Sequence, residues 1–199
     1  YVIDNLNNRL QVFNLDGSFI KSISVSGNKQ LFLTPYDVCC DENLLFITDT
    51  GNKRIQILNS DGDLVRTISS KGKQRLFSVP IGICCGDGLL FVSDHNNNRV
   101  LVFTYEGTHL RNIGIKGNGE GELNSPHGLA YHEGLLYVID NANNRIQIFN
   151  QEGKFIRSIG EKGIGSGQFS LPRGVCIGNH NIFVADTNNH RIQSIPIKS

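Results

Sequence analysis

Three features of the 199-residue sequence predict an all-β fold made of repeated four-stranded sheets. One line recurs along the chain, and its copies "YVIDNLNNRLQVFN" from Tyr1 and "YVIDNANNRIQIFN" from Tyr137 are nearly identical. Short apolar or alternating segments follow one another with no segment of helical period between them. Acidic-glycine pairs stand at equivalent points between these segments, as in tight hairpins.

The repeat has a period of 45 or 46 residues, which is typical of propellers and solenoids. Because no helical segment interrupts the pattern, helical solenoids are excluded and a β-propeller is predicted. The repeated aspartates and arginines are Asp4, Asp49, Asp94, Asp140 and Asp186, with Arg9, Arg54, Arg99, Arg145 and Arg191.

The unit from Pro80 to Gly114 shows how each strand is assigned. The segment "PIGICCG" is short and apolar, "LLFVSD" is rich in large and β-branched residues, and "RVLVF" alternates. A fourth segment, "HLRNIG", follows the turn "TYEG". These segments predict four antiparallel strands, called a to d from the axis outward.

Counted in this way, the chain supplies strands b, c and d, then three complete blades, then strands a, b and c, which makes eighteen strands. We expect one domain over residues 1–199, and we expect its N-terminal part to precede Tyr1, because the chain opens inside a repeat. The predicted blades are residues 1–34 (partial), 35–79, 80–125, 126–171 and 172–199 (partial).

Strands a and d have compositions that fit their places in a blade. Strand a carries Gly82, Gly128 and Gly174 near its start, and small residues let inner strands converge. Strand d is the outer edge, where a charge discourages pairing with another chain. The charged residues at its matching positions are Lys21, Arg66, Arg111 and Arg157.

Composition limits the class of protein. With 39% hydrophobic and 19% charged residues and no long apolar run, the chain resembles a soluble globular protein and not a membrane protein. The five cysteines include two adjacent pairs, which are poor disulfide candidates, so we expect a reducing, cytoplasmic compartment. We interpret the cysteines as small core residues and expect no metal and no cofactor.

The combination of Pro-x-Gly-apolar, a hairpin, and apolar-Asp-x-x-Asn-x-Arg-Ile-Gln resembles the NHL repeat over essentially the whole chain. Departures are local: Asp37 replaces the first glycine, and Leu101 and Pro196 interrupt the strand-c consensus. The resemblance implies a six-bladed ring, of which five blades are represented here, and a five-bladed ring, which would lack only two strands, is the alternative. The residues that carry it most completely are Pro126, Gly128, Asp140, Asn143, Arg145, Ile146 and Gln147.

The repeated Asp and Arg residues are interpreted as structural, because they recur in every blade and an active site needs a broken symmetry. Asp ends strand b and Arg begins strand c, so the two can bridge the hairpin, while Asn in the turn tolerates left-handed geometry. The glycine-rich segments "GIKGNGEGEL" and "GEKGIGSGQF" precede strands and open no helix, which argues against phosphate cradles.

Function is expected where the blades differ, at the residue between Pro and Gly of strand a. This residue is Tyr36, Ile81, His127 or Arg173. The resemblance extends to peptidyl-hydroxyglycine amidating lyases, in which a Pro-His at this place holds zinc. Since zinc needs three or four ligands and this chain offers His127 alone, we expect a polar surface residue there. A metal-dependent propeller lyase or hydrolase is the less favoured alternative.

The net charge of +1 hides an expected asymmetry between the two faces. The a-b and c-d turns are predicted to be acidic and free of lysine and arginine, and they contain Asp16, Asp41, Glu42, Asp61, Asp63, Asp87, Glu106, Glu133 and Glu152. The d-a and b-c loops are predicted to be basic, with Lys29, Lys53, Lys71, Lys73, Arg75, Lys116, Lys162 and Arg173 against Asp37, Glu120, Glu122 and Glu161.

The sequence therefore predicts a non-catalytic recognition or scaffold domain that binds protein or RNA on its basic face. Cations beside aromatic rings can hold single-stranded nucleic acid, and polarised charge steers anionic partners. The resemblance implies, as an alternative, the RNA-binding substrate-recognition domain of a tripartite-motif ubiquitin ligase, with stem-loop or single-stranded RNA as partner. The expected contact residues are Tyr36, Lys71, Lys73, Arg75, Phe77, Ile81, His127 and Arg173.

Overall fold

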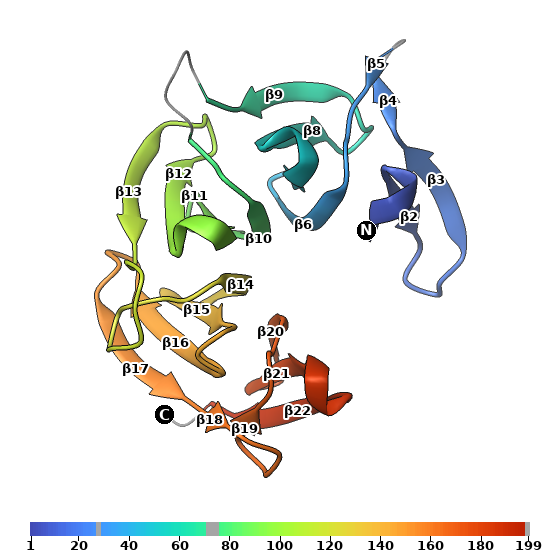
Figure 1. Ribbon diagram of the computed structural model, residues 1–199. Coiled ribbons are helices and arrows are strands. Elements are labelled where there is room, and N and C mark those ends of the chain that lie inside the picture. The colour runs from blue at the N-terminus through green and yellow to red at the C-terminus, as the bar shows by residue number, and fades with distance from the viewer. Residues whose placement is uncertain (27–28, 71–75, 198–199) are drawn as a thin grey trace. The chain divides into compact units, whose positions relative to one another are not determined.

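The computed structural model describes residues 1–26, 29–70 and 76–197, and it confirms the all-β fold (Figure 1). Five antiparallel sheets of three, four, four, four and three strands contain the eighteen predicted strands. In each sheet, neighbouring strands are also consecutive in the chain. Each sheet lies within one of the five residue ranges that the repeat predicts.

The five sheets have the following bounds. They are β1 (Val2–Asp4), β2 (Arg9–Phe13) and β3 (Phe19–Ile23); β6 (Pro35–Asp41), β7 (Leu44–Asp49), β8 (Arg54–Asn59) and β9 (Leu64–Ile68); β10 (Pro80–Gly86), β11 (Leu89–Asp94), β12 (Arg99–Thr104) and β13 (His109–Ile113); β14 (Pro126–His132), β15 (Leu135–Asp140), β16 (Arg145–Asn150) and β17 (Phe155–Ile159); and β20 (Gly174–Gly178), β21 (Asn181–Asp186) and β22 (Arg191–Pro196).

Smaller elements lie between these strands. Short 3-10 turns join strand b to strand c, namely η1 (Asn5–Asn7), η2 (Thr50–Asn52), η3 (His95–Asn97) and η4 (Thr187–Asn189). Two short strand pairs lie in the d-a links, β4 (Val25–Ser26) with β5 (Lys29–Gln30) and β18 (Glu161–Lys162) with β19 (Gln168–Phe169). Among the described residues, no helix has the length and apolar character needed to cross a membrane.

The chain forms two compact units, Tyr1–Ile83 and Cys84–Ser199, and the boundary falls inside β10. In the first unit, the core lies between the sheets β1-β3 and β6-β9 and includes Leu10, Phe32 and Ile47. In the second unit, one core cluster includes Phe91 and Phe149, and a second brings β15 and β16 together with β21. Burying each such side chain contributes roughly 1.5–3 kcal/mol.

Gly128 shows why strand a favours glycine. A Cβ atom at this position would lie 2.5 Å from the carbonyl oxygen of Arg173, which is too close for any side chain. This approach lets the Gly128 N–H donate to the same oxygen at 2.8 Å, so β14 is tied to the residue that precedes β20. The inner strands of these two sheets therefore meet through their backbones.

Asp37 takes the place of this glycine in β6 and makes a different connection. Its Oδ2 accepts a hydrogen bond from the Ile83 N–H of β10 at 3.0 Å, and its Oδ1 accepts from Val38 N–H at 2.9 Å. Burial raises the pKa of Asp37 to about 6, although both N–H groups act in the opposite direction. A carboxyl group thus bridges two inner strands at this point.

The strand-d cations contact neighbouring sheets, which the sequence analysis did not anticipate. Lys21 Nζ donates to the carbonyl oxygens of Ser60 and Asp61, at 3.2 and 3.1 Å, in the turn between β8 and β9. Arg111 donates to the carbonyl oxygen of Gln151 in the turn between β16 and β17. In these two places, the charged edge residue also links one sheet to the next.

Candidate recognition site

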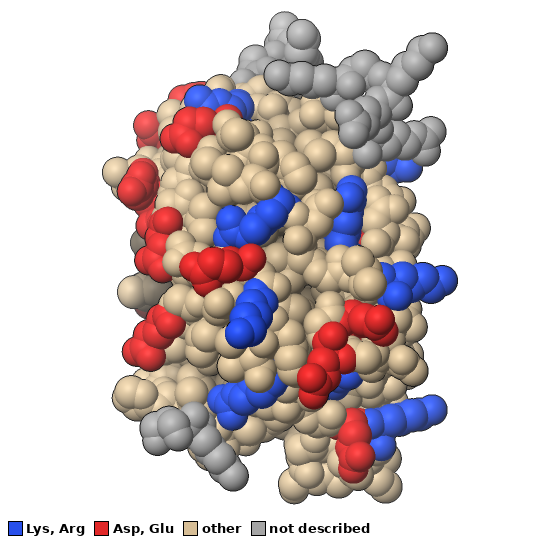
Figure 2. Space-filling model, turned by 90° about the vertical axis from the view of Figure 1, so that its left-hand side faces the viewer, with Lys and Arg blue, Asp and Glu red and all other residues tan. Residues whose placement is uncertain are grey.

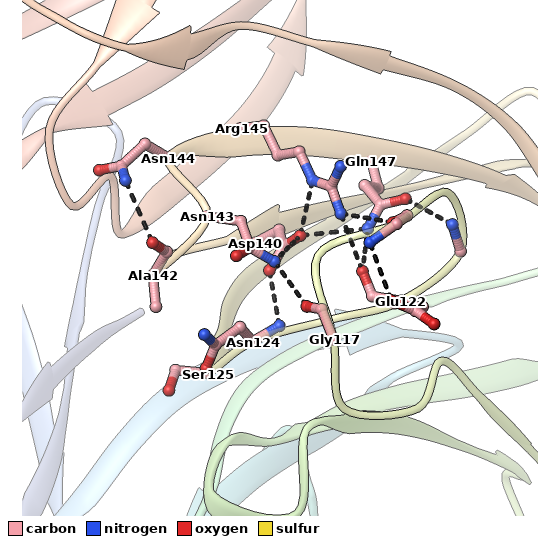
Figure 3. A network of polar contacts seen from close by, with 12 residues as sticks. Gly117, Glu122, Asn124, Ser125, Asp140, Ala142, Asn143, Asn144, Arg145 and Gln147 are labelled. Atoms are coloured by element: carbon pink, nitrogen blue, oxygen red, sulfur yellow. Dashed lines mark hydrogen bonds and ion pairs between the residues drawn. The ribbon is translucent and has the colours of Figure 1, made fainter.

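A buried polar cluster around Asp140 shows how the repeated residues are used (Figure 3). Its Oδ2 accepts hydrogen bonds from Arg145 Nε at 2.8 Å, Asn143 Nδ2 at 2.9 Å and Gln147 Nε2 at 3.1 Å. Its Oδ1 accepts from the Asn124 N–H at 2.7 Å. The carboxylate therefore joins the b-c turn, strand c and the link that leads into the same blade.

The contact between Asp and Arg is present in all five hairpins. Hydrogen bonds from Arg9 and Asn7 hold the pKa of Asp4 below its usual value. Burial acts to raise the pKa of Asp186, but hydrogen bonds led by the Ser170 N–H outweigh it and lower the pKa. The N–O distances are 2.6 Å for Arg9–Asp4, 2.6 Å for Arg54–Asp49, 3.5 Å for Arg99–Asp94, 2.8 Å for Arg145–Asp140 and 2.8 Å for Arg191–Asp186.

The glycine-rich links use their polar backbone groups inside the fold. Arg145 Nη2 donates to the carbonyl oxygens of Gly119 and Glu122, at 2.6 and 3.1 Å. Glu122 Oε2 accepts from the Gly119 N–H at 2.9 Å, and Gln147 Oε1 accepts from the Gly121 N–H at 2.9 Å. The Gly119 and Gly121 N–H groups, which a phosphate could have used, are thus already bonded to side chains of the protein.

The b-c turns also hold the next sheet, a role that sequence reasoning missed. The first residue after the repeated Asp contacts the carbonyl oxygen of the proline in the next strand a. The contacts are Asn5 Nδ2 to Pro35 at 2.7 Å, Thr50 Oγ1 to Pro80 at 2.6 Å, His95 Nδ1 to Pro126 at 3.3 Å and Asn141 Nδ2 to Pro172 at 2.8 Å.

A second residue of the turn adds to this connection. Asn8, Asn98 and Asn144 lie in the left-handed region, with φ of 53°, 54° and 57°. Their Oδ1 atoms accept from backbone N–H groups in the following link, for example from Leu171 at 2.9 Å. The sequence predicted the left-handed geometry of Asn, but not the bond that its side chain makes with the next link.

The predicted contact residues differ in exposure. Tyr36 is 39% exposed, and Arg173 is exposed as well. Phe77, Ile81 and His127 are only 1%, 7% and 7% exposed, so the expectation that these three side chains lie on the surface is wrong. The apolar groups gain free energy by leaving water, and the His127 ring packs against other parts of the second unit. Lys71, Lys73 and Arg75 lie outside the described residues.

The acidic turns stand out in the charge distribution, and Figure 2 shows acidic side chains along its left-hand side. The expectation that these turns contain no lysine is wrong, because Lys154 lies between Gly153 and the start of β17. On the opposite loops, the described cations Lys53, Lys116, Lys162 and Arg173 are matched in number by Asp37, Glu120, Glu122 and Glu161. The expected basic excess rests on Lys71, Lys73, Arg75 and the Lys29 side chain, which are not described.

Three basic side chains come together in the second unit. His127 lies in β14, His95 begins η3, and Arg173 directly precedes β20. The two imidazole rings are 5.9 Å apart between centroids and nearly perpendicular. The His127 carbonyl oxygen accepts from Ser93 Oγ at 2.7 Å, which fixes the backbone of this histidine against β11.

The environment keeps His127 neutral at neutral pH. Burial lowers its pKa to about 4, and the nearby His95 and Arg173 add to this effect. A hydrogen bond between His127 and the Arg173 backbone acts in the opposite direction. Among the described residues, no three His, Cys, Asp or Glu side chains are grouped so that they could hold a metal ion.

Comparison with known proteins places these sheets in a family. A family model described as "6-bladed beta-propeller" matches residues 73–130 and 122–194, which is more than half of the chain. The chain belongs to this family. Its five sheets are propeller blades, as the sequence period predicted. A comparison with curated proteins gave no significant match.

Solved propeller structures resemble the chain in fold. Virginiamycin B lyase from Staphylococcus aureus is 18% identical with a TM-score of 0.71, and the match covers 98% of this chain and 61% of the lyase chain. A chain of a nidogen/laminin complex is 20% identical with a TM-score of 0.74, over 94% and 67% of the two chains. A streptogramin B lyase is 20% identical with a TM-score of 0.67, over 98% and 64%. The propeller thus spans about three fifths of the first lyase chain.

Proposed function

We propose that this propeller is a non-catalytic recognition domain that binds a protein partner through its b-c and d-a loops. The observation that carries the proposal is the contrast between repeated and non-repeated polar residues. Repeated groups such as Asp140 and Arg145 are committed to hydrogen bonds that build blades. Tyr36 and Arg173 occupy the variable position of strand a and are exposed.

The residue types around these positions support a protein interface. Tyrosine and arginine are enriched at such interfaces and often contribute much of the binding energy. In the first unit, Leu33 is 46% exposed close to Tyr36 in the chain. In the second unit, Leu171 is 38% exposed two residues before Arg173, and Ile164 in the preceding link is 82% exposed. Each unit therefore offers an apolar group beside its variable residue.

One structural likeness and one sequence resemblance support this proposal. One solved relative in fold comes from a nidogen/laminin complex, which is an assembly of proteins. The NHL-repeat resemblance implies protein or RNA partners and a parent of the tripartite-motif type. RNA binding would depend on Lys71, Lys73 and Arg75, because the described side chains of the same loops are balanced in charge. The cytoplasmic location stays a prediction.

The test is affinity capture with the purified, tagged chain, with and without nuclease. Capture of specific proteins should survive nuclease and should be lost in Tyr36→Ala or Arg173→Gln, since each variant removes an exposed side chain at the variable position of strand a. Lys154→Gln, on the opposite turns, is the matched control and should capture normally. Loss of all capture with nuclease would favour RNA, with a log-log salt slope of about 0.7 per phosphate contact. Unchanged capture by both variants would overturn the proposal.

A further inference from the structure

The cluster of His95, His127 and Arg173 breaks the symmetry of the repeat at two repeat positions. Where Arg173 stands, the other blades have Tyr36, Ile81 and His127. Where His95 stands, three other turns have Asn5, Thr50 and Asn141, and these make the same contact with a proline carbonyl oxygen. An asparagine would therefore satisfy the fold at position 95, so the imidazole adds a basic group that the blade does not need.

Arg173 and His95 each have a polar group available for a ligand. Arg173 is exposed, and its guanidinium group makes no hydrogen bond or ion pair with the part of the chain that the structure describes. His95 uses Nδ1 toward the Pro126 carbonyl oxygen, which leaves Nε2 for another contact. The neighbouring carboxylate of Asp94 is directed elsewhere, because it is 2.6 Å from Asn97 Nδ2 and 3.5 Å from Arg99 Nη2.

His127 would respond to an anion bound beside it. The charged or titratable groups that lower its pKa are His95, in η3, and Arg173, ahead of β20, and both are basic. An opposite charge within about 4–6 Å raises the pKa of such a group by roughly 1–3 units. Arg173 would thus hold an anion at any pH used here. The bound anion would also favour protonation of His127 in mildly acidic solution.

An exposed apolar side chain, Leu171, lies two residues before Arg173 in the chain. Leu171 is 38% exposed although its φ is 45°, a left-handed conformation that a bulky side chain rarely adopts. Its N–H donates to Asn144 Oδ1, which holds the strained residue in place. The same left-handed conformation and the same N–H bond to asparagine recur at Thr34 and Ser125, so the repeat itself fixes this backbone. The segment from Leu171 to Arg173 therefore presents an apolar side chain and a guanidinium group from one rigid backbone.

We infer that His95, His127 and Arg173 form a binding site for the carboxylate of an acidic protein segment, with Leu171 contacting an apolar residue of the same segment. This inference rests on the proposed recognition function and specifies the chemistry of the partner. Arg173 pairs with the carboxylate through parallel N–H groups, and His95 Nε2 approaches from η3. His127 beneath them adds a third donor when it is protonated.

A fluorescent, end-blocked hexapeptide with one leucine and two glutamates is the probe for this site, and anisotropy measures its affinity. The peptide should bind about tenfold more tightly at pH 5.0 than at pH 7.5, as follows if the bound anion raises the pKa of His127 by about 2 units. The same peptide with glutamines in place of glutamates should show no such dependence.

Variants separate the site from general charge effects. Arg173→Gln should lose the acidic peptide at both pH values, and His95→Asn, which keeps the proline contact, should weaken it at least threefold at pH 5.0. Lys162→Gln removes an exposed cation from a d-a link and should bind normally. Equal binding of the two peptides, or no binding of either, would overturn the carboxylate assignment. If cellular partners still require Arg173 in that case, the recognition function stands and its ligand is not an acidic segment.

Discussion

Replacing Asp140 by alanine should destabilise the chain more than the same replacement of Asp4. Asp140 is fully buried, and its loss leaves the Asn124 N–H and the mostly buried Arg145 side chain without their shared acceptor. Breaking a buried ion pair by removing one partner costs about 3–5 kcal/mol. Asp4 makes the same contact with Arg9, but the two side chains are 24% and 39% exposed, so water can replace the lost bond.

Urea unfolding followed by far-UV circular dichroism measures both free energies on the same chain. We expect the Asp140→Ala variant to lose about 3–5 kcal/mol of unfolding free energy, and the Asp4→Ala variant to lose clearly less. The unfolding free energy of the conservative variant Asp140→Asn should lie between those of the wild type and Asp140→Ala, because asparagine keeps one acceptor for the Asn124 N–H. A loss below about 1 kcal/mol for Asp140→Ala would refute the assignment of the repeated aspartates to the scaffold.

Three other changes have definite expected outcomes. Because the pKa of Asp37 is raised to about 6 from an ordinary value near 4, stability should fall as pH rises from 4 to 6, by up to about 3 kcal/mol, and urea unfolding of Asp37→Asn should show a flatter pH profile. Lys53 has a φ of 53°, in the left-handed region that asparagine tolerates, so Lys53→Asn should raise the unfolding free energy by about 0.5–1 kcal/mol; a decrease would contradict this. Gly128→Ala should lower the melting temperature, with a loss above about 2 kcal/mol, because its Cβ would meet the Arg173 carbonyl oxygen; an unchanged melting temperature would contradict the close approach.

Much of the fold was predictable from the sequence because each blade repeats the same local instructions. The alternation of apolar residues and the acidic-glycine turns specify strands and hairpins within one unit. The contact between Asp140 and Arg145 follows from their places at the ends of adjacent strands, where the register puts them opposite each other. These contacts join residues of the same blade, so the sequence pattern of a single repeat is enough to predict them.

Contacts between blades were not predictable in the same way. The bond from Asn141 to the Pro172 carbonyl oxygen joins residues 31 positions apart, and no pattern within one unit indicates it. The burial of Ile81 and His127 likewise depends on neighbouring segments, while the alternation of a single strand leaves both faces possible. The residue types of Phe77 and Ile81 partly indicated their burial, because apolar residues usually lie in the core.

We propose that repeated residues build the blades and that non-repeated residues bind a partner, and Arg173→Gln tests this proposal most directly. Partner capture and urea unfolding should be measured on the same preparation of this variant. We expect capture to be lost while the unfolding free energy stays within about 0.5 kcal/mol of the wild type. Normal capture, or a large loss of stability, would contradict it.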